Sequence, residues 1–157
     1  MKKVIEGKSD YIFSYMNRLF DQGKTAWVVV TGMSMYPFLR ENLDMVELTR
    51  AGFSRIKKGD IVLIQRLNGE FVLHRVIKKN PSNLYIIGDA QQWLEGPILE
   101  NQLMAIAINI RRDNKIVSCN NRLLKALVCL WFIARPIRNR LIQIIRYIGR
   151  MRIVCRY

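Results

Sequence analysis

The sequence is poor in several side chains on which enzymes commonly depend. It holds one histidine, His74, which excludes any site built from two or more histidines. It holds three cysteines, Cys119, Cys129 and Cys155, an odd number whose spacing matches no metal motif. We therefore predict that the protein uses no metal and no cofactor. We interpret the cysteines as reduced structural thiols, which are usual in cytosolic proteins.

Acidic residues are also scarce, twelve against 26 Lys and Arg, and the imbalance is concentrated at the C-terminal end. Residues 111–157 carry twelve basic residues and one acid, Asp113, a net charge of +11, whereas residues 1–110 carry +3. Because these basic residues are interspersed with Leu, Ile, Trp and Tyr, we expect the tail to meet an anionic membrane surface. A tail helix that covers the body of the protein is a close second interpretation, and a nucleic-acid arm is a distant third.

Long apolar runs are missing as well. No stretch reaches the roughly 18 apolar residues of a membrane-spanning helix, and the first residues lack the apolar core of a secretory signal. We therefore expect a cytoplasmic location, peripheral on the cytoplasmic face of the membrane if the tail binds lipid. With 157 residues, half of them hydrophobic, the chain is long enough for one modest globular domain.

The middle of the chain is predicted to be mainly β. Short β-rich runs bounded by turn residues occupy 28–30, 44–48, 61–64, 71–77, 85–87 and 102–110, the last of which we take as the final strand. Asn68-Gly69 is a strong hairpin signal between two of them. Lys57-Lys58-Gly59-Asp60 reads as a turn in which the Asp60 carboxylate caps backbone amides.

Helices are predicted at both ends. Ser9 or Asp10 can cap a short helix to Phe20 that packs on the β region. Its apolar face would comprise Ile12, Tyr15, Met16, Leu19 and Phe20. An apolar helix over 123–134 follows Asn121, is broken at Arg135-Pro136, and continues from Ile137 with arginines at intervals. We thus divide the chain into 1–25 (helix), 26–112 (β domain) and 113–157 (basic helical tail).

Ser34 is the candidate nucleophile. It follows the β-branched run Val28–Val30 and lies two residues after Gly32, which permits a positive φ, and Pro37 prevents a continuing strand. Such a serine lies at a rigid corner that a substrate can reach, although a serine there is more commonly a hydrogen-bonded turn residue. His74 and Asp89 follow on two later strand-like segments. A hydroxyl, an imidazole and a carboxylate are the groups that serine hydrolysis needs.

Four segments in this order resemble the signal peptidase I and LexA-like (S24/S26) serine peptidase superfamily. They are GMSMYP (32–37), KKGDIVLI (57–64), VLHRVI (72–77) and IIGDAQQW (86–93), and the resemblance covers residues 26–112. The His74-Arg75 pair resembles the histidine type of signal peptidase. The resemblance implies a mainly β, barrel-like fold carrying a serine endopeptidase.

The same resemblance implies the roles of the site residues. Ser34 would be the nucleophile, His74 the general base, and Asp89 the acid that orients the His74 ring. The backbone amide of Ser34 would help to bind the oxyanion. Activity would decrease as the pH falls below about 6.5, the ordinary pKa of a histidine. Trp93 and Leu94 are predicted to pack, and Arg75 to be structural, paired with an acid.

Two features depart from the family. Gly32 stands where signal peptidases have a serine that helps to hold the oxyanion, so that task would fall to backbone amides or to Thr31. Leu43-Asp44 keeps the family's acid but loses its glycine, which would alter a turn and leave the chemistry unchanged.

The predicted substrate is a peptide or a precursor protein. A non-catalytic binding module on the same fold is the main alternative. A LexA-like regulator fits less well, because it would need a DNA-binding domain and a self-cleavage site ahead of the serine, and its usual base is lysine.

Overall fold

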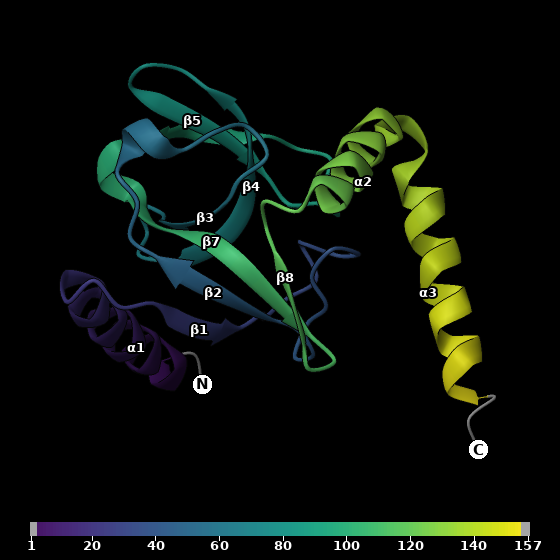
Figure 1. The fold of residues 1–157 in the computed structure, drawn as a ribbon, viewed down its shortest axis with the longest axis horizontal. Coiled ribbons are helices and arrows are strands. Elements are labelled where there is room, and N and C mark those ends of the chain that lie inside the picture. Colours follow the sequence, from purple (N-terminus) through teal and green to yellow (C-terminus); the bar gives the residue numbers. More distant parts are fainter. Residues whose placement is uncertain (1–2, 155–157) are drawn as a thin grey trace.

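The computed structural model describes residues 3–154, and its side chains are described for residue 11 and for the ranges 13–138 and 140–148. It consists of a curved antiparallel sheet with one helix at its N-terminal side and two helices at its C-terminal side (Figure 1). The mainly β fold class is therefore confirmed. The strands are β1 (Ala26–Val29), β2 (Met45–Thr49), β3 (Ile61–Gln65), β4 (Phe71–Lys79), β5 (Asn83–Ile87), β6 (Glu95–Leu99), β7 (Leu103–Arg112) and β8 (Lys115–Ser118).

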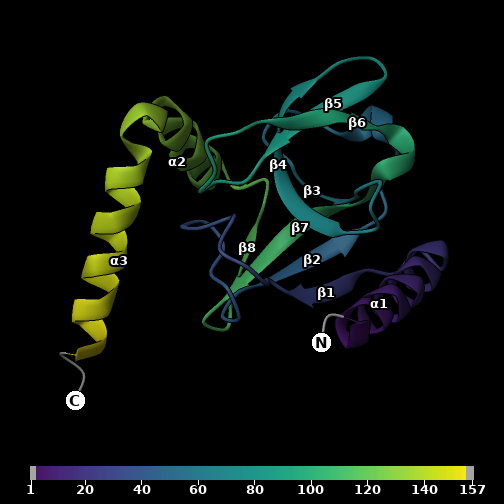
Figure 2. The same cartoon turned by 180° about the vertical axis from the view of Figure 1, so that it is seen from behind.

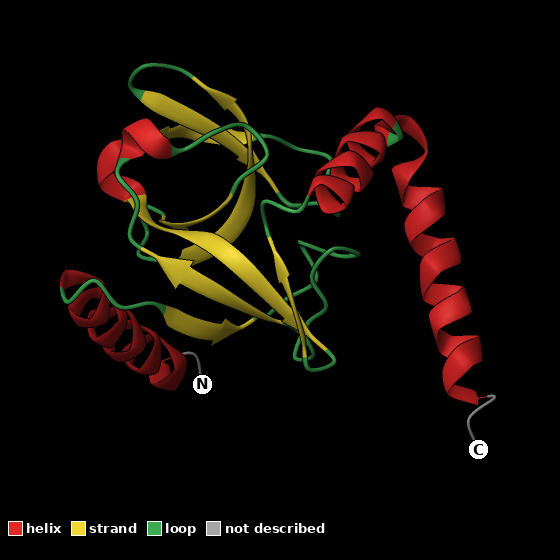
Figure 3. Ribbon diagram, viewed as in Figure 1, coloured by secondary structure: helices red, strands yellow, loops and turns green. Residues whose placement is uncertain are grey.

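The strands run in the order β1-β2-β7-β3-β4-β5-β6, with β8 paired to β7. The view from behind in Figure 2 shows how this sheet curls so that β5 and β6 rise above β2 and β7. Three short 3-10 segments, Phe53–Arg55, Glu100–Gln102 and Arg135–Ile137, connect the larger elements. Figure 3 separates these helical turns from the strands and loops.

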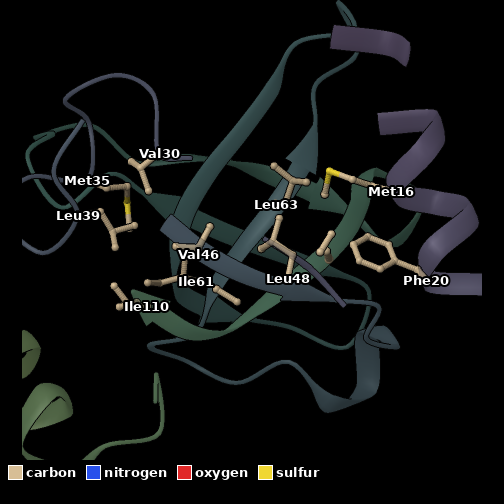
Figure 4. Packing of buried hydrophobic residues seen from close by; sticks show 13 residues of the cluster. Met16, Phe20, Val30, Met35, Leu39, Val46, Leu48, Ile61, Leu63 and Ile110 are labelled. Atoms are coloured by element: carbon tan, nitrogen blue, oxygen red, sulfur yellow. The ribbon is translucent and has the colours of Figure 1, made fainter. Parts of the chain in front are cut away.

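Strand β3 lies in the middle of the sheet. All four residues of its apolar run, Ile61–Ile64, are accordingly buried. Alternate side chains of a strand point to opposite faces. Ile61 and Leu63 accordingly join one hydrophobic cluster, while Val62 and Ile64 join a second. The first cluster lies between the sheet, helix α1 (Lys3–Asp21) and the loop after β1 (Figure 4).

Helix α1 packs on the sheet as predicted, but its start and its face differ from the prediction. The helix already includes Ser9 and Asp10, so neither begins it. Met16 and Phe20 are buried in the first cluster, whereas Tyr15 is exposed. Phe13 takes the place predicted for Tyr15 and stacks on Phe71 with ring centroids 3.3 Å apart. The side chain of Ile12 lies outside the described residues.

Two turn predictions are confirmed. Gly69 adopts φ +86° in the hairpin between β3 and β4. The amide of Lys57 donates to the Asp60 carboxylate at 2.8 Å, which closes the turn before β3. Two strands escaped prediction: β6 contains both Gly96 and Pro97, and β8 follows the strand that we expected to be the last.

The predicted helical tail is present as helices α2 (Arg122–Ile133) and α3 (Arg138–Val154). The Asn121 side chain accepts hydrogen bonds from the amides of Leu123 and Leu124, which is how an N-cap satisfies the first helical donors. Within the described range, no helix combines the length and the apolar character needed to cross a membrane. Cys119 and Cys129 are free thiols, and Cys155 lies outside the described residues.

Candidate active site

The loop between β1 and β2 holds Ser34 at its corner. Gly32 adopts φ +78°, as predicted, and its amide donates to the Glu41 carboxylate at 2.9 Å. The residues after Ser34 anchor the loop, because Met35 and Leu39 are buried in the first cluster (Figure 4). Ser34 itself is half-buried. A serine between a left-handed glycine and a buried methionine is held in place while part of it stays accessible.

Asp44 lies at the end of the same loop, directly before β2, and anchors it through hydrogen bonds. It is fully buried and accepts hydrogen bonds from the Arg40 amide at 2.8 Å and from Arg112 at 2.6 Å. Burial alone would raise its pKa, but the hydrogen bonds from Arg112 and Arg40 hold the pKa of Asp44 below its ordinary value. Arg112 also donates to the carbonyl of Phe38 at 2.8 Å. The acid that the sequence retains beside Leu43 is therefore the anchor of the serine loop.

Gly88 brings the serine loop against the sheet next to His74. Arg75 on β4 pairs with Ile87 on β5, so the register carries Gly88 beside His74. A Cβ atom at Gly88 would lie 2.6 Å from the backbone oxygen of Ser34, closer than atoms can approach. The same oxygen accepts a hydrogen bond from the Ala90 amide at 2.8 Å. The absence of a side chain at Gly88 thus allows the Ser34 backbone to pack against the paired strands β4 and β5.

His74 lies on β4, opposite Val62 of β3, and only 1% of it is exposed. Burial disfavours the charged imidazolium and lowers the pKa of His74 to about 4; the nearby Glu95 opposes this effect and Arg66 adds to it. The ring is therefore neutral at physiological pH, the form that can accept a proton. We expected activity to fall below about pH 6.5 because that is the pKa of an exposed histidine. The lower pKa of the buried ring moves the expected fall in activity to lower pH.

Ser34 and His74 line one cavity of about 280 Å³. Most of the residues that line it are apolar, and Arg66 and Gln91 contribute polar groups. Phe13 of α1 also reaches it. The structure thus brings the predicted nucleophile and base to a common space. The other residues that line it are Val28, Val29, Val30, Thr31, Met35, Val46, Leu48, Leu63, Phe71, Val72 and Leu73.

In the described structure Asp89 makes no hydrogen bond or ion pair with His74, which differs from the predicted role. Its two carboxylate oxygens accept hydrogen bonds from Nε and Nη2 of Arg75 at 2.8 and 2.7 Å. Both side chains are buried, and Arg75 also donates to the carbonyl of Gly59 at 2.8 Å. The prediction that Arg75 pairs with an acid is confirmed. The physical reason is the alternation along β4, which directs Arg75 and its partner to the face opposite His74.

Glu95, which was not predicted from the sequence, is the only carboxylate in the described part of the chain within 4.0 Å of a ring nitrogen of His74. Its Oε2 lies 3.7 Å from Nδ1 of His74, beyond hydrogen-bond distance, and Nδ1 has no other partner. Arg66 holds Glu95 through two hydrogen bonds of 2.6 and 2.7 Å. These bonds, opposed by partial burial, lower the pKa of Glu95. Glu95 is the first residue of β6, a strand that was not predicted because it contains Gly96 and Pro97.

Backbone donors are available at the serine corner. Among the described residues, the amides of Ser34 and Met35 make no hydrogen bond, whereas Tyr36 donates to the Met33 carbonyl at 3.2 Å. Thr31 is exposed and lines the cavity. Unused amides at a rigid turn are the groups that stabilise a developing oxyanion.

The C-terminal helices hold the segment behind Ser34. Trp131 of α2 donates from Nε1 to the carbonyl of Asp89 at 2.7 Å, and Arg138 of α3 donates to the carbonyl of Gln91 at 2.7 Å. Arg135 donates to the carbonyl of Gln92. The amide of Ala90 in this segment donates to the Ser34 carbonyl. The helices therefore contact the backbone of residues 89–92, and this backbone in turn contacts Ser34.

Trp93 and Leu94, which we expected to pack, are both exposed. They follow the segment that the C-terminal helices hold. Across the described residues, no group of three or more His, Cys, Asp or Glu side chains is placed to hold a metal ion.

On a curved antiparallel sheet, the structure groups a half-buried serine, a buried histidine and a nearby carboxylate, which are the kinds of side chain that serine hydrolases use. The family model for Peptidase S24-like proteins matches residues 2–108. The chain therefore belongs to the Peptidase S24-like family, and the resemblance in the sequence is confirmed. None of the curated proteins matches the chain.

Proposed function

We propose that the protein is a serine endopeptidase that cleaves a peptide or a precursor protein. The observation that carries the proposal is the shared cavity of Ser34 and His74, with Glu95 behind the imidazole. Family membership supports a peptidase at the level of the fold. The signal-peptidase-like character is part of the proposal and rests on the His74-Arg75 pair.

The reaction would proceed through an acyl-enzyme. Ser34 Oγ attacks the scissile carbonyl carbon while Nε2 of His74 takes the hydroxyl proton. The amides at the serine corner bind the oxyanion, and the tetrahedral intermediate collapses as His74 returns the proton to the leaving amine. Water, deprotonated by His74, then attacks the ester, and Ser34 is regenerated.

We assign the positioning of His74 to Glu95 in place of Asp89. For Nε2 to accept a proton, Nδ1 must carry hydrogen, and a carboxylate on that side stabilises the imidazolium that forms. The gap of 3.7 Å would close by a movement of less than about 1 Å, and catalytic hydrogen bonds are often long before substrate binds. Arg66 keeps Glu95 ionised in the meantime.

An extended substrate fits the edge of the sheet. Strand β1 pairs with β2 alone among the described strands, and its residues Val28 and Val29 line the cavity together with Val30, which follows the strand. A peptide could add to that edge as a further strand, which supplies main-chain hydrogen bonds and fixes the scissile bond near Ser34.

The test is cleavage of a synthetic peptide library, with the new termini identified by mass spectrometry. Ser34→Ala should abolish cleavage, and His74→Asn should lower the rate at least about 10²-fold because the base is lost. Ser82→Ala, in an exposed loop, is the matched control and should cleave like the wild type. Cleavage that survives in Ser34→Ala would exclude Ser34 as the nucleophile.

A peptide-binding module on the same fold is the second candidate, favoured by the unpaired Nδ1 of His74 and the engagement of Glu95 by Arg66. It predicts that the wild type and Ser34→Ala bind the same peptides with equal affinity and leave them intact.

A further inference from the structure

The side of helix α2 that faces away from the sheet is apolar and uncovered. Val128 and Trp131 are buried against the body of the protein, whereas Leu123 and Ile133 are 76% and 71% exposed. Leu127 and Leu130 are exposed as well. These four exposed residues recur at helical spacing, so they form one stripe along α2.

The stripe continues past the corner into α3. Ile137, at the corner, is 54% exposed, and the exposed residues of α3 include Ile144, Tyr147 and Ile148. Ile142 is buried on the inner side. Figures 1 and 2 both show α3 extending away from the sheet, so no other helix or strand of the described residues covers its outer side. An exposed apolar surface this long marks an interaction site.

The charge of these helices selects the partner. From residue 114 onward the chain contains no acidic residue. Arg122, Lys125 and Arg140 are exposed. A second copy of the chain would bring like charges together, and nucleic acid would leave the leucine and isoleucine stripe unused. A bilayer with anionic headgroups satisfies both features, because apolar side chains enter the acyl boundary while basic ones contact the headgroups.

The exposed Trp93 and Leu94 lie next to this surface. They follow Gln92, whose carbonyl accepts a hydrogen bond from Arg135 at the corner between α2 and α3. Tryptophan is enriched at membrane interfaces because its ring is apolar at one end and polar at the other. The exposure of Trp93, unexpected for a residue of the β domain, is thereby explained.

We propose that α2 and α3 form a docking surface for an anionic lipid bilayer, with the stripe Leu123, Leu127, Leu130 and Ile133 facing the acyl chains. The opposite side of the same helices holds residues 89–92 through Trp131, Arg135 and Arg138. Docking therefore fixes the orientation of the catalytic body relative to the membrane. The surface includes neither Ser34 nor His74, so the proposal holds or fails independently of peptidase activity.

The experiment is co-sedimentation of the full chain with vesicles of phosphatidylcholine alone or mixed with phosphatidylglycerol. We expect strong binding to the anionic vesicles that weakens with salt, and weak binding to the neutral ones. Leu127→Glu combined with Ile133→Glu should lower the partition coefficient at least about tenfold. Leu67→Glu, at a hairpin residue that is 94% exposed, is the matched control and should bind like the wild type.

A second variant separates the electrostatic contribution. Arg122→Gln combined with Arg140→Gln should lower binding to anionic vesicles about 25-fold, roughly fivefold for each arginine, and leave binding to neutral vesicles unchanged. Equal binding of the Leu127/Ile133 variant and the wild type would overturn the proposal. So would a wild-type dimer in sedimentation velocity that this variant abolishes, or binding of duplex DNA in preference to anionic vesicles.

Discussion

Two arginine–carboxylate pairs of nearly the same geometry perform different tasks in this protein. Arg75 and Asp89 bond at 2.8 and 2.7 Å, and Arg66 and Glu95 at 2.6 and 2.7 Å. Their surroundings differ: the side chains of Arg75 and Asp89 are 5% and 0% exposed, those of Arg66 and Glu95 33% and 21%.

The difference in burial decides what each carboxylate can do. Asp89 has no solvent to replace Arg75, and its backbone carbonyl is occupied by Trp131, so this pair is part of the scaffold. Glu95 lies at the edge of the cavity with a second possible partner, Nδ1 of His74. A carboxylate that can change partners is suited to respond to charge that develops during a reaction.

The largest expected effect comes from breaking the buried pair. Asp89→Ala leaves the Arg75 guanidinium buried and uncompensated, which should cost about 3–5 kcal/mol of unfolding free energy. Urea unfolding monitored by circular dichroism measures it. Replacing both residues, with Arg75→Met and Asp89→Leu, should cost less than Asp89→Ala alone. A greater loss in the double variant would contradict this view of the pair.

The next effect concerns the histidine between the two pairs. Folded His74 has a pKa of about 4, and in the unfolded chain the value is about 6.5, so the unfolded state binds the proton first as pH falls. The stability due to this group is complete above pH 6.5 and should decline by about 3 kcal/mol as pH falls through 4. The measurement is the unfolding free energy of the wild type minus that of His74→Gln, followed from pH 7 to pH 4. A difference independent of pH would show that His74 titrates normally.

The exposed pair should affect turnover more than stability. Glu95→Gln keeps the shape of the side chain but removes the charge behind His74, and we expect kcat to fall about 10²-fold. The change in unfolding free energy should stay within about 1 kcal/mol, because partly exposed ion pairs contribute little. Asp89→Asn should show the reverse pattern, a large loss of stability with the pH profile of the remaining activity unchanged. Equal kcat in Glu95→Gln and the wild type would remove Glu95 from the mechanism.

The smallest effect tests the electrostatic link between the pair and the base. Arg66→Met removes a positive charge that lowers the pKa of His74 and frees Glu95 to face the imidazole. The pKa should rise above about 4 toward its ordinary value. Since His74 is the only histidine, its Hε1 resonance in an NMR titration reports this pKa without overlap from another imidazole. Arg55→Met, at an exposed arginine, should leave that resonance unchanged.

The sequence predicts those parts of the fold that depend on local patterns. The apolar strand at Ile61–Ile64, the hairpin at Asn68-Gly69 and the helix that follows Asn121 are set by residues close together in the chain, and all appear in the structure. Gly32 and Ser34 are recognisable for the same reason, since a glycine and a nearby proline specify a corner. Helix α1 was located correctly, but the choice of Phe13 over Tyr15 depends on Phe71, which is distant in sequence.

Which carboxylate lies near His74 could not be predicted from the sequence, because it depends on the register of the strands. Asp89 and Glu95 are six residues apart, and only the pairing of β4 with β5 and of β5 with β6 decides which one faces the imidazole. The depressed pKa of His74 has the same origin, since burial arises from the whole sheet. Local patterns identify the candidate site residues, and long-range strand pairing determines their electrostatics.

Gly88 has a consequence for anyone who wishes to build such a site elsewhere. Copying a serine loop and a histidine strand onto another antiparallel sheet would not be sufficient, because a methyl group at the position of Gly88 would collide with the Ser34 carbonyl at 2.6 Å. A designer would have to transfer an empty space together with the side chains. In this protein, one of the requirements for bringing Ser34 close to His74 is an atom that is not there.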